Sequence, residues 1–266
     1  MRTLGGCVSD VIGRGGGGMM RRFFTFLKTE LILSLRDMNM PIFAVIMPLV
    51  IFIILGIIYG SGPAYDRADH TFLEQSFGAV CAVAICAGGL MGLPQAVADS
   101  RERKVLKRFK VTPVSPAFIL GVELAMYVVY CAVSLLTLSA AAILWGVRLH
   151  GSLIGFIGSW GLTMLSTLSV GMLVGGVAKD TKQSAVIASV LYFPMLIFSG
   201  TTLPLEVMPK AMQSIVGLFP LTQGITMMKN TFLGVGTWEG VLLPTGVMLG
   251  LAALCTVLAV RFFRWE

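Results

Sequence analysis

The amino-acid sequence predicts an all-α integral membrane protein, and three observations lead to this prediction. The 266 residues are 56% hydrophobic and only 12% charged, with a mean hydropathy of +0.87. A soluble domain carries roughly 25% charged residues, so this chain has too few to cover a water-facing surface. The charges also gather in short clusters between long uncharged runs, as expected where lipid surrounds most of the chain.

The first forty residues precede the first apolar run. Residues 1–20 include four consecutive glycines and are expected to form a flexible leader. Residues 21–40 are expected to form an amphipathic helix that lies in the membrane interface, because apolar side chains recur there at helical spacing beside basic residues. The apolar side chains are Phe23, Phe24, Leu27, Leu31 and Leu35.

Six apolar runs are long enough to cross the roughly 30 Å of hydrocarbon in a bilayer. They predict a six-helix transmembrane domain over residues 41–262, with a basic loop at residues 99–116. Residues 206–230 are shorter and are split by Pro220, so a re-entrant helical hairpin on the outer side is expected there. The spans are predicted at residues 42–60, 76–98, 117–147, 152–178, 184–205 and 240–260.

The distribution of basic residues predicts which way the chain faces. With six spans, both termini lie on one side, and 16 of the 20 Lys and Arg residues fall on that side. The other side keeps Arg67, Arg148, Lys210 and Lys229. By the positive-inside rule both termini are expected in the cytoplasm, with the protein in the cell inner membrane. Topology also explains the net charge of +7, so no nucleic-acid partner is expected.

Several small residues inside the spans have structural explanations. Gly88, Gly89 and Gly92 would let another helix approach closely. Pro48 is expected to kink the first span. The cysteines form no C-x-x-C pair and are expected to act as small apolar residues inside helices; they are Cys7, Cys81, Cys86, Cys131 and Cys255.

The sequence predicts no enzyme and no bound cofactor. It has no G-x-x-x-x-G-K-[ST] phosphate-binding loop. His70 and His150 are its only histidines, and neither lies in the middle of a span, which argues against a metal site and an intramembrane protease. Energy for any transport is therefore expected from outside the chain.

Glu123 is the only acidic residue in a predicted span that could serve as a buried ionisable site. An ion-coupled carrier would usually have several such residues near the middle of the membrane. Glu123 is expected either to hydrogen-bond to neighbouring helices or face cytoplasmic water, or to take part in gating or substrate contact.

Two segments carry a resemblance to a known family. Residues 101–116 read RERKVLKRFKVTPVSP, in which an acidic-basic start leads to a leucine, a basic pair and Thr-Pro-Val. Residues 192–209 read YFPMLIFSGTTLPLEVMP and are followed by Phe-Pro-Leu-Thr at residues 219–222. Together they resemble the permeases of type-2 ABC exporters, in the branch that exports drugs and antibiotics. The family often has glycine where Lys104 stands.

The resemblance implies that the chain works with other subunits. Two copies of a separate ABC ATPase would bind ATP and magnesium, and a second permease protomer would complete the membrane domain. That protomer is expected to be a second copy of this chain, with a heterodimer left open. Export would move substrate out of the cytoplasm or out of the inner leaflet.

The resemblance also assigns two sets of residues. The loop at 99–116 would dock on the ATPase; the alternative is a solvated basic loop that touches anionic lipid. An outer gate would involve Phe198, Met208 and Phe219, for which packing alone is the alternative. The ATPase-coupling residues would be Arg101, Glu102, Val105, Leu106, Lys107, Arg108 and Phe109.

The expected pathway lies between two protomers and is lined by the first, second and fifth spans. Methionine and aromatic side chains there suit a hydrophobic or amphipathic substrate, such as a drug, antibiotic or lipid-like molecule. Two alternatives are a permease for lipid-linked glycans and a secondary carrier that works without ATP. The expected pathway residues are Met47, Met91, Phe193, Met195 and Phe198.

Overall fold

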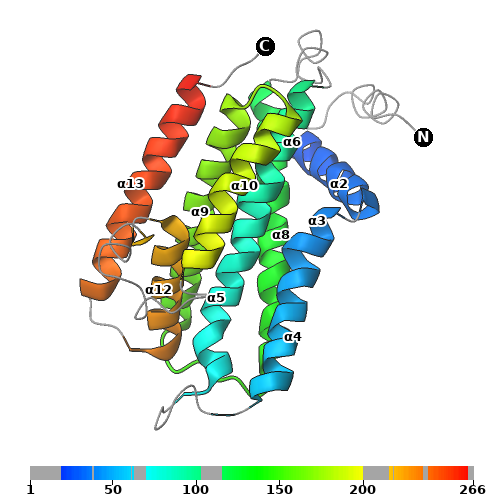
Figure 1. The fold of residues 1–266 in the computed structure, drawn as a ribbon. Coiled ribbons are helices and arrows are strands. Elements are labelled where there is room, and N and C mark those ends of the chain that lie inside the picture. Colours follow the sequence, from blue (N-terminus) through cyan, green and yellow to red (C-terminus); the bar gives the residue numbers. More distant parts are fainter. Residues whose placement is uncertain are drawn as a thin grey trace.

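The computed structural model is helical throughout its described part (Figure 1). Among the described residues, five helices are long and apolar enough to cross a membrane, which supports a multi-pass membrane protein. The leader through residue 18, the coupling residues Val105, Leu106, Lys107, Arg108 and Phe109, and Met208 lie outside the described residues. The structure describes residues 19–37, 39–60, 62, 70–102, 116–199, 216–217, 219–235 and 239–262.

The chain begins with the predicted amphipathic helix. α2 (Met19–Asp37) runs at a steep angle to the other helices (Figure 1). Leu27 is buried against the core, and the ring of Phe23 lies 5.7 Å from that of Phe118. Phe24 and Leu35, on the flank of the same helix, are exposed. A helix with apolar residues facing away from the protein suits the membrane interface.

The first long helix contains a π-helical turn. A short helix, α3 (Asn39–Pro41), leads into η1 (Ile42–Ile46), and α4 (Met47–Tyr59) follows. Pro48 has no N–H and therefore cannot donate to the carbonyl four residues earlier. The residue before it, Met47, donates its N–H to Ile42 O, five residues earlier, as in a π-helix. The structure thus has a π-helical turn directly before Pro48, and a kink of the helix axis there stays a prediction.

The second long helix runs unbroken over 31 residues, Phe72–Glu102. It consists of α5 (Phe72–Cys86), the π-helical turn η2 (Ala87–Gly92) and α6 (Leu93–Glu102). Again a proline, Pro94, follows the π-helical turn after one residue. This helix is longer at both ends than the predicted span 76–98.

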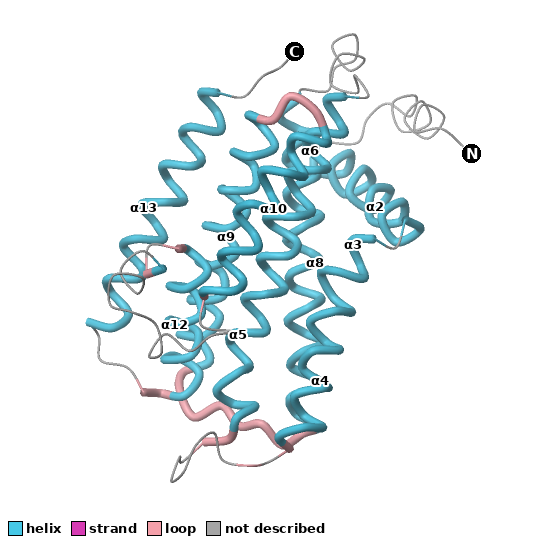
Figure 2. The backbone as a smooth tube through the Cα atoms, in the orientation of Figure 1, coloured by secondary structure: helices cyan, strands magenta, loops and turns pink. Residues whose placement is uncertain are grey.

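The next three helices are close to the predictions. They are α8 (Pro116–Leu144), α9 (Leu153–Val177) and α10 (Thr181–Phe198). The fifth predicted span extends to residue 205, whereas α10 ends at Phe198 and Ser199 is its C-cap residue. A tight turn joins α9 to α10 (Figure 2).

The last two helices differ in length and burial. α12 (Pro220–Leu233) is too short to span a membrane and packs against α5, α9 and α13. It corresponds to the second half of the predicted hairpin, and residues 200–215 before it are not described. α13 (Glu239–Phe262) contains the sixth apolar segment, at Pro244–Ala259, and packs mainly on α9.

Two ends of the molecule can be distinguished. α2, the C-terminal ends of α6 and α13, and the α9–α10 turn lie at one end, named here the α2 end (Figure 1). The beginning of α5 and the α8–α9 loop lie at the opposite end, named the Glu74 end after a residue described below.

Close helix packing depends on the glycines of the second long helix. A Cβ at Gly89 would lie 2.9 Å from Thr167 of α9, and one at Gly92 would lie 2.5 Å from Tyr127 of α8. Gly171 of α9 lies directly against the carbonyl of Gly89. The prediction of close approach is confirmed at Gly89 and Gly92, while Gly88 has only ordinary contacts. The cysteines at 81, 86, 131 and 255 are buried, as expected.

Candidate functional site

A cavity of about 1590 Å³ lies among the described helices. α4 and α10 supply its sides, and the second long helix supplies its floor. Met47 and Phe193 line it while 44% and 53% exposed, so the cavity opens to the surface between α4 and α10. Its lining is mostly apolar, which suits a ligand with a large apolar body.

Three of the five residues expected to line the pathway border this cavity. Met47, Met91 and Phe193 line it, as expected for residues of the first, second and fifth spans. Met195 does not, because its side chain turns into the protein core and is buried there. Phe198 is also absent from the described lining of the cavity. The role of these residues in a pathway between two protomers stays a prediction.

Acidic residues gather where the cavity reaches the α2 end. Glu30 from α2, Asp99 from α6 and Glu123 from α8 all line it there. Glu30 and Asp99 are close enough to interact electrostatically with Glu123. Burial raises the pKa of the Glu30 carboxyl above its ordinary value. At the other end of the cavity, the described lining includes Lys229 of α12.

Glu123 matches its first predicted alternative only in part. Its side chain is 8% exposed, so it does not face open water. Ser100 of α6 hydrogen-bonds to the carboxyl group. The Oε2 atom is buried and has no hydrogen-bond partner among the described residues. A buried acceptor without a partner is costly, so this atom needs an explanation.

Arg101 and Glu102, at the end of α6, bind the α9–α10 turn. The Arg101 Nη1 donates to Gly176 O at 3.1 Å, and its Nη2 donates to Gly175 O at 3.1 Å and to Ala178 O. These carbonyls end α9, where a cation is favourable. Arg101 is only 9% exposed, and its predicted role in docking on an ATPase stays a prediction.

Glu102 places a negative charge at the start of α10, whereas Arg101 places a positive charge at the end of α9. Its Oε2 accepts from the backbone N–H of Thr181 at 3.1 Å and from the Thr181 hydroxyl at 2.5 Å. Thr181 begins α10, where a negative charge is favourable. The end of α6 is thus fastened to both α9 and α10, directly before the predicted coupling loop.

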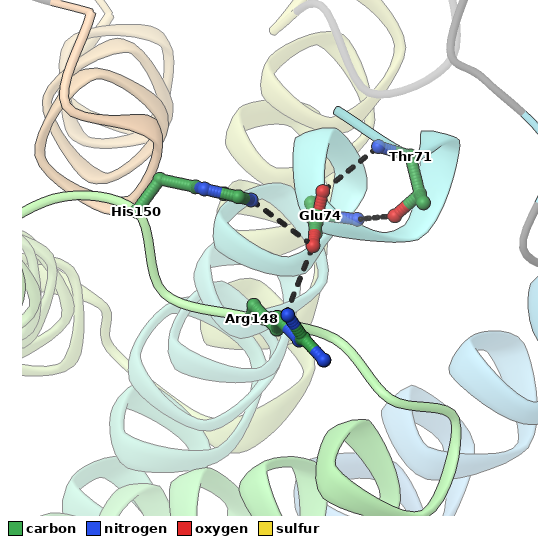
Figure 3. Close-up of polar contacts among 4 residues, drawn as sticks. All are labelled: Thr71, Glu74, Arg148 and His150. Atoms are coloured by element: carbon green, nitrogen blue, oxygen red, sulfur yellow. Dashed lines mark hydrogen bonds and ion pairs between the residues drawn. The ribbon is translucent and has the colours of Figure 1, made fainter. Parts of the chain in front are cut away.

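A second polar cluster closes the Glu74 end (Figure 3). Glu74 is 5% exposed, and its carboxylate accepts from the N–H of Thr71 at 2.8 Å and of Arg148 at 3.0 Å. The His150 Nε2 lies 3.3 Å from the same carboxylate. The N–H groups of His150 and Gly151 also donate to Phe232 O of α12.

Sequence reasoning missed this cluster, although a signal was present. Thr71 and Glu74 form a capping box in the pattern T-x-x-E, which marks the start of a helix. The predicted second span begins only at residue 76, so both residues fall before it. The cluster connects α5, the α8–α9 loop and α12, so it fixes the position of α12.

Two of the three predicted gate residues, Phe198 and Phe219, lie in the described part of the chain. Phe219 immediately precedes α12, is half-buried and packs against the large apolar cluster around Phe77. Phe198 is half-buried at the end of α10. Their role in a gate stays a prediction. No group of three or more potential metal-ligating side chains occurs in the part of the chain that the structure describes.

Comparison with known proteins gives a consistent result. The model of the family "ABC-2 type transporter" matches residues 21–233. A daunorubicin resistance ABC transporter permease protein, DrrB1 from Streptomyces coeruleorubidus, is 27% identical over 60% of this chain and 58% of its own length. The inner membrane transport permease YhhJ from Escherichia coli (strain K12) is 27% identical over 50% of this chain and 36% of its own.

A third relative has a different kind of name. Nodulation protein J from Neorhizobium galegae is 29% identical over 38% of this chain and 36% of its own length. The chain thus spans between about a third and three-fifths of the lengths of these relatives.

Proposed function

Because the chain belongs to the ABC-2 type transporter family, we propose that it is the permease of an ATP-driven exporter for hydrophobic or amphipathic molecules. The observation that carries this proposal is the mostly apolar cavity that runs between α4 and α10. The substrate enters this cavity from the cytoplasm or from the inner leaflet. DrrB1, which is named for resistance to a drug, supports a substrate of this kind.

The α2 end is the cytoplasmic end in this proposal. It holds Arg101, the basic turn at Lys179 and Lys182, and Arg261 at the end of α13, as the positive-inside rule requires. α13 is the sixth span, and α12 is the inserted half of a re-entrant segment. The Glu74 cluster holds α12 from the outer side of the inner membrane.

The ATPase acts on the loop after Glu102. Two ATPase copies bind ATP and magnesium, and each pushes on the coupling loop of one protomer. Arg101 and Glu102 act as a mechanical link in this proposal, because they join the beginning of that loop to the ends of α9 and α10. A displacement of the loop is then passed to α10, which forms one side of the cavity.

A second copy of the chain completes the cavity. α4 and α10 expose apolar residues on both sides of the opening, including Ile54 and Val190. A second protomer that packs against these faces would convert an open groove into an enclosed pathway. The homodimer is therefore part of the proposal.

Affinity purification tests the partnership with the ATPase. The tagged chain, extracted from its own membrane in mild detergent, should retain an ABC ATPase that mass spectrometry identifies. The double variant Lys107→Glu and Arg108→Glu should lose that ATPase, because the basic pair faces an acidic surface in the docked state. Arg36→Glu is the matched control, since it reverses an exposed charge on α2. Equal ATPase recovery with the double variant and the control would refute the assigned docking contact.

A further inference from the structure

Glu123 is a buried carboxylate for which the fold gives no structural reason. It lies on α8 and lines the cavity. Its Oε2 atom is buried, and no described residue donates a hydrogen bond to it. A group of this kind is usually satisfied by a neighbouring side chain, by water or by a ligand. Glu123 lines the cavity, so its carboxyl group can act on a charged ligand there even though the Oε2 atom itself is closed to solvent.

Charged side chains of opposite sign line the two ends of the cavity. Glu30 and Asp99 reinforce the negative potential at Glu123, at the α2 end. Lys229 lines the opposite end, where its backbone packs against Gly78 of α5, one turn from Gln75. Gln75 and Asp99 lie on one continuous helix, roughly 35 Å apart at 1.5 Å per residue. Within the described lining of the cavity, a positive ligand group is therefore favoured beside Glu123 and disfavoured beside Lys229.

The surroundings of Glu123 suit a cation that is carried on an apolar body. Tyr127 lies one helical turn from Glu123 on α8, lines the same cavity and offers an aromatic ring. Met126 and Met91 lie beside it in the lining and can adapt to different apolar shapes. A small inorganic cation would gain nothing from these apolar contacts.

From this arrangement we propose that the α2 end of the cavity binds the positive group of an amphipathic organic cation, with Glu123 as its counter-charge. The proposal deepens the proposed function, on which it rests, by naming the substrate class. Two sources share this chemistry, a soluble lipophilic amine and the ammonium headgroup of an aminophospholipid.

Binding of tetraphenylphosphonium to the full chain tests the site. The chain is placed in phosphatidylglycerol nanodiscs, and empty nanodiscs supply the background. Saturable binding is expected, and Glu123→Gln should weaken it about tenfold or more because a close counter-charge is lost. Glu123→Asp should bind more tightly than Glu123→Gln. Neutral triphenylphosphine oxide should bind wild type and Glu123→Gln alike.

The control separates a local effect from a change in overall charge. Asp180→Asn removes a negative charge at the same end, outside the described cavity lining, and asparagine still caps α10. It should bind tetraphenylphosphonium as wild type does. If Glu123→Gln does not yield folded protein, Glu30→Gln on α2 replaces it, with a weaker loss of binding expected.

The outcomes assign the site or reject it. Absence of saturable binding, equal binding by wild type and Glu123→Gln, or an equal loss in Asp180→Asn would overturn the proposal. Competition by added phosphatidylethanolamine would assign the site to a lipid headgroup, and its absence would assign it to a soluble cation. No ATPase is present in this assay, so a chain that binds the cation but recruits no ATPase would refute the proposed function alone.

Discussion

Replacing Arg101 by alanine should loosen the end of α6 from the α9–α10 turn. In the structure the guanidinium makes two hydrogen bonds of 3.1 Å, to Gly175 O and Gly176 O, and a third bond to Ala178 O. Hydrogen bonds to a charged group contribute about 1.5–3 kcal/mol each. The adjoining residues Lys179 and Asp180 are exposed, so water can replace part of what is lost. We therefore expect Arg101→Ala to lower the free energy of unfolding by about 2–4 kcal/mol.

Thermal unfolding in detergent measures this loss. For soluble domains of comparable size, 1 kcal/mol corresponds to about 2–4 °C, so a decrease of about 5–15 °C is expected. Arg101→Lys should fall between wild type and Arg101→Ala, because lysine keeps the charge without the planar fork. Arg36→Ala, on the exposed face of α2, is the control for losing a basic residue. A decrease for Arg101→Ala no larger than that for Arg36→Ala would show that the link contributes nothing to the fold.

Two further predictions concern packing and the Glu74 end. Gly171→Ala should destabilise the protein by about 1–3 kcal/mol, because the new Cβ would press on the backbone carbonyl of Gly89. Gly161→Ala, on the same helix with no described atom within 4 Å, should instead stabilise it by about 0.5–1 kcal/mol, and equal unfolding temperatures for the two variants would contradict the packing. Glu74→Gln should lower the unfolding temperature by weakening the contacts with His150 and the two backbone N–H groups. An unchanged temperature would show that this cluster does not hold the end together.

Hydropathy predicted the long helices well, because lipid requires long uncharged helical segments whatever their packing. The errors in the predicted helix boundaries have specific causes. Glu74 is charged, so the sequence placed it outside the membrane helix, yet hydrogen bonds from two other segments allow it to be buried. The π-helical turns before Pro48 and Pro94 depend on how the chain redirects a few hydrogen bonds. Hydropathy does not report such changes.

The side chains of the candidate site were harder to predict. In helices that are apolar all round, no amphipathic pattern shows which face meets the cavity. Met195 therefore could not be distinguished from Phe193, although one lies in the core and the other in the cavity. Arg101 stands in a basic run that suggests exposure, and only the nearby end of α9 explains why it turns inward. Glu123 could be recognised as unusual from the sequence, but its proximity to Glu30 and Asp99 depends on tertiary packing.

Transport into inside-out membrane vesicles tests the central claim most directly, because the vesicle interior corresponds to the cell exterior. Vesicles that contain the chain and its ATPase should accumulate fluorescent hydrophobic dyes when hydrolysable ATP is supplied. Vesicles that lack either subunit, or that receive a non-hydrolysable ATP analogue, should not accumulate them. Accumulation by the chain without its ATPase would contradict the account and establish a carrier that works alone.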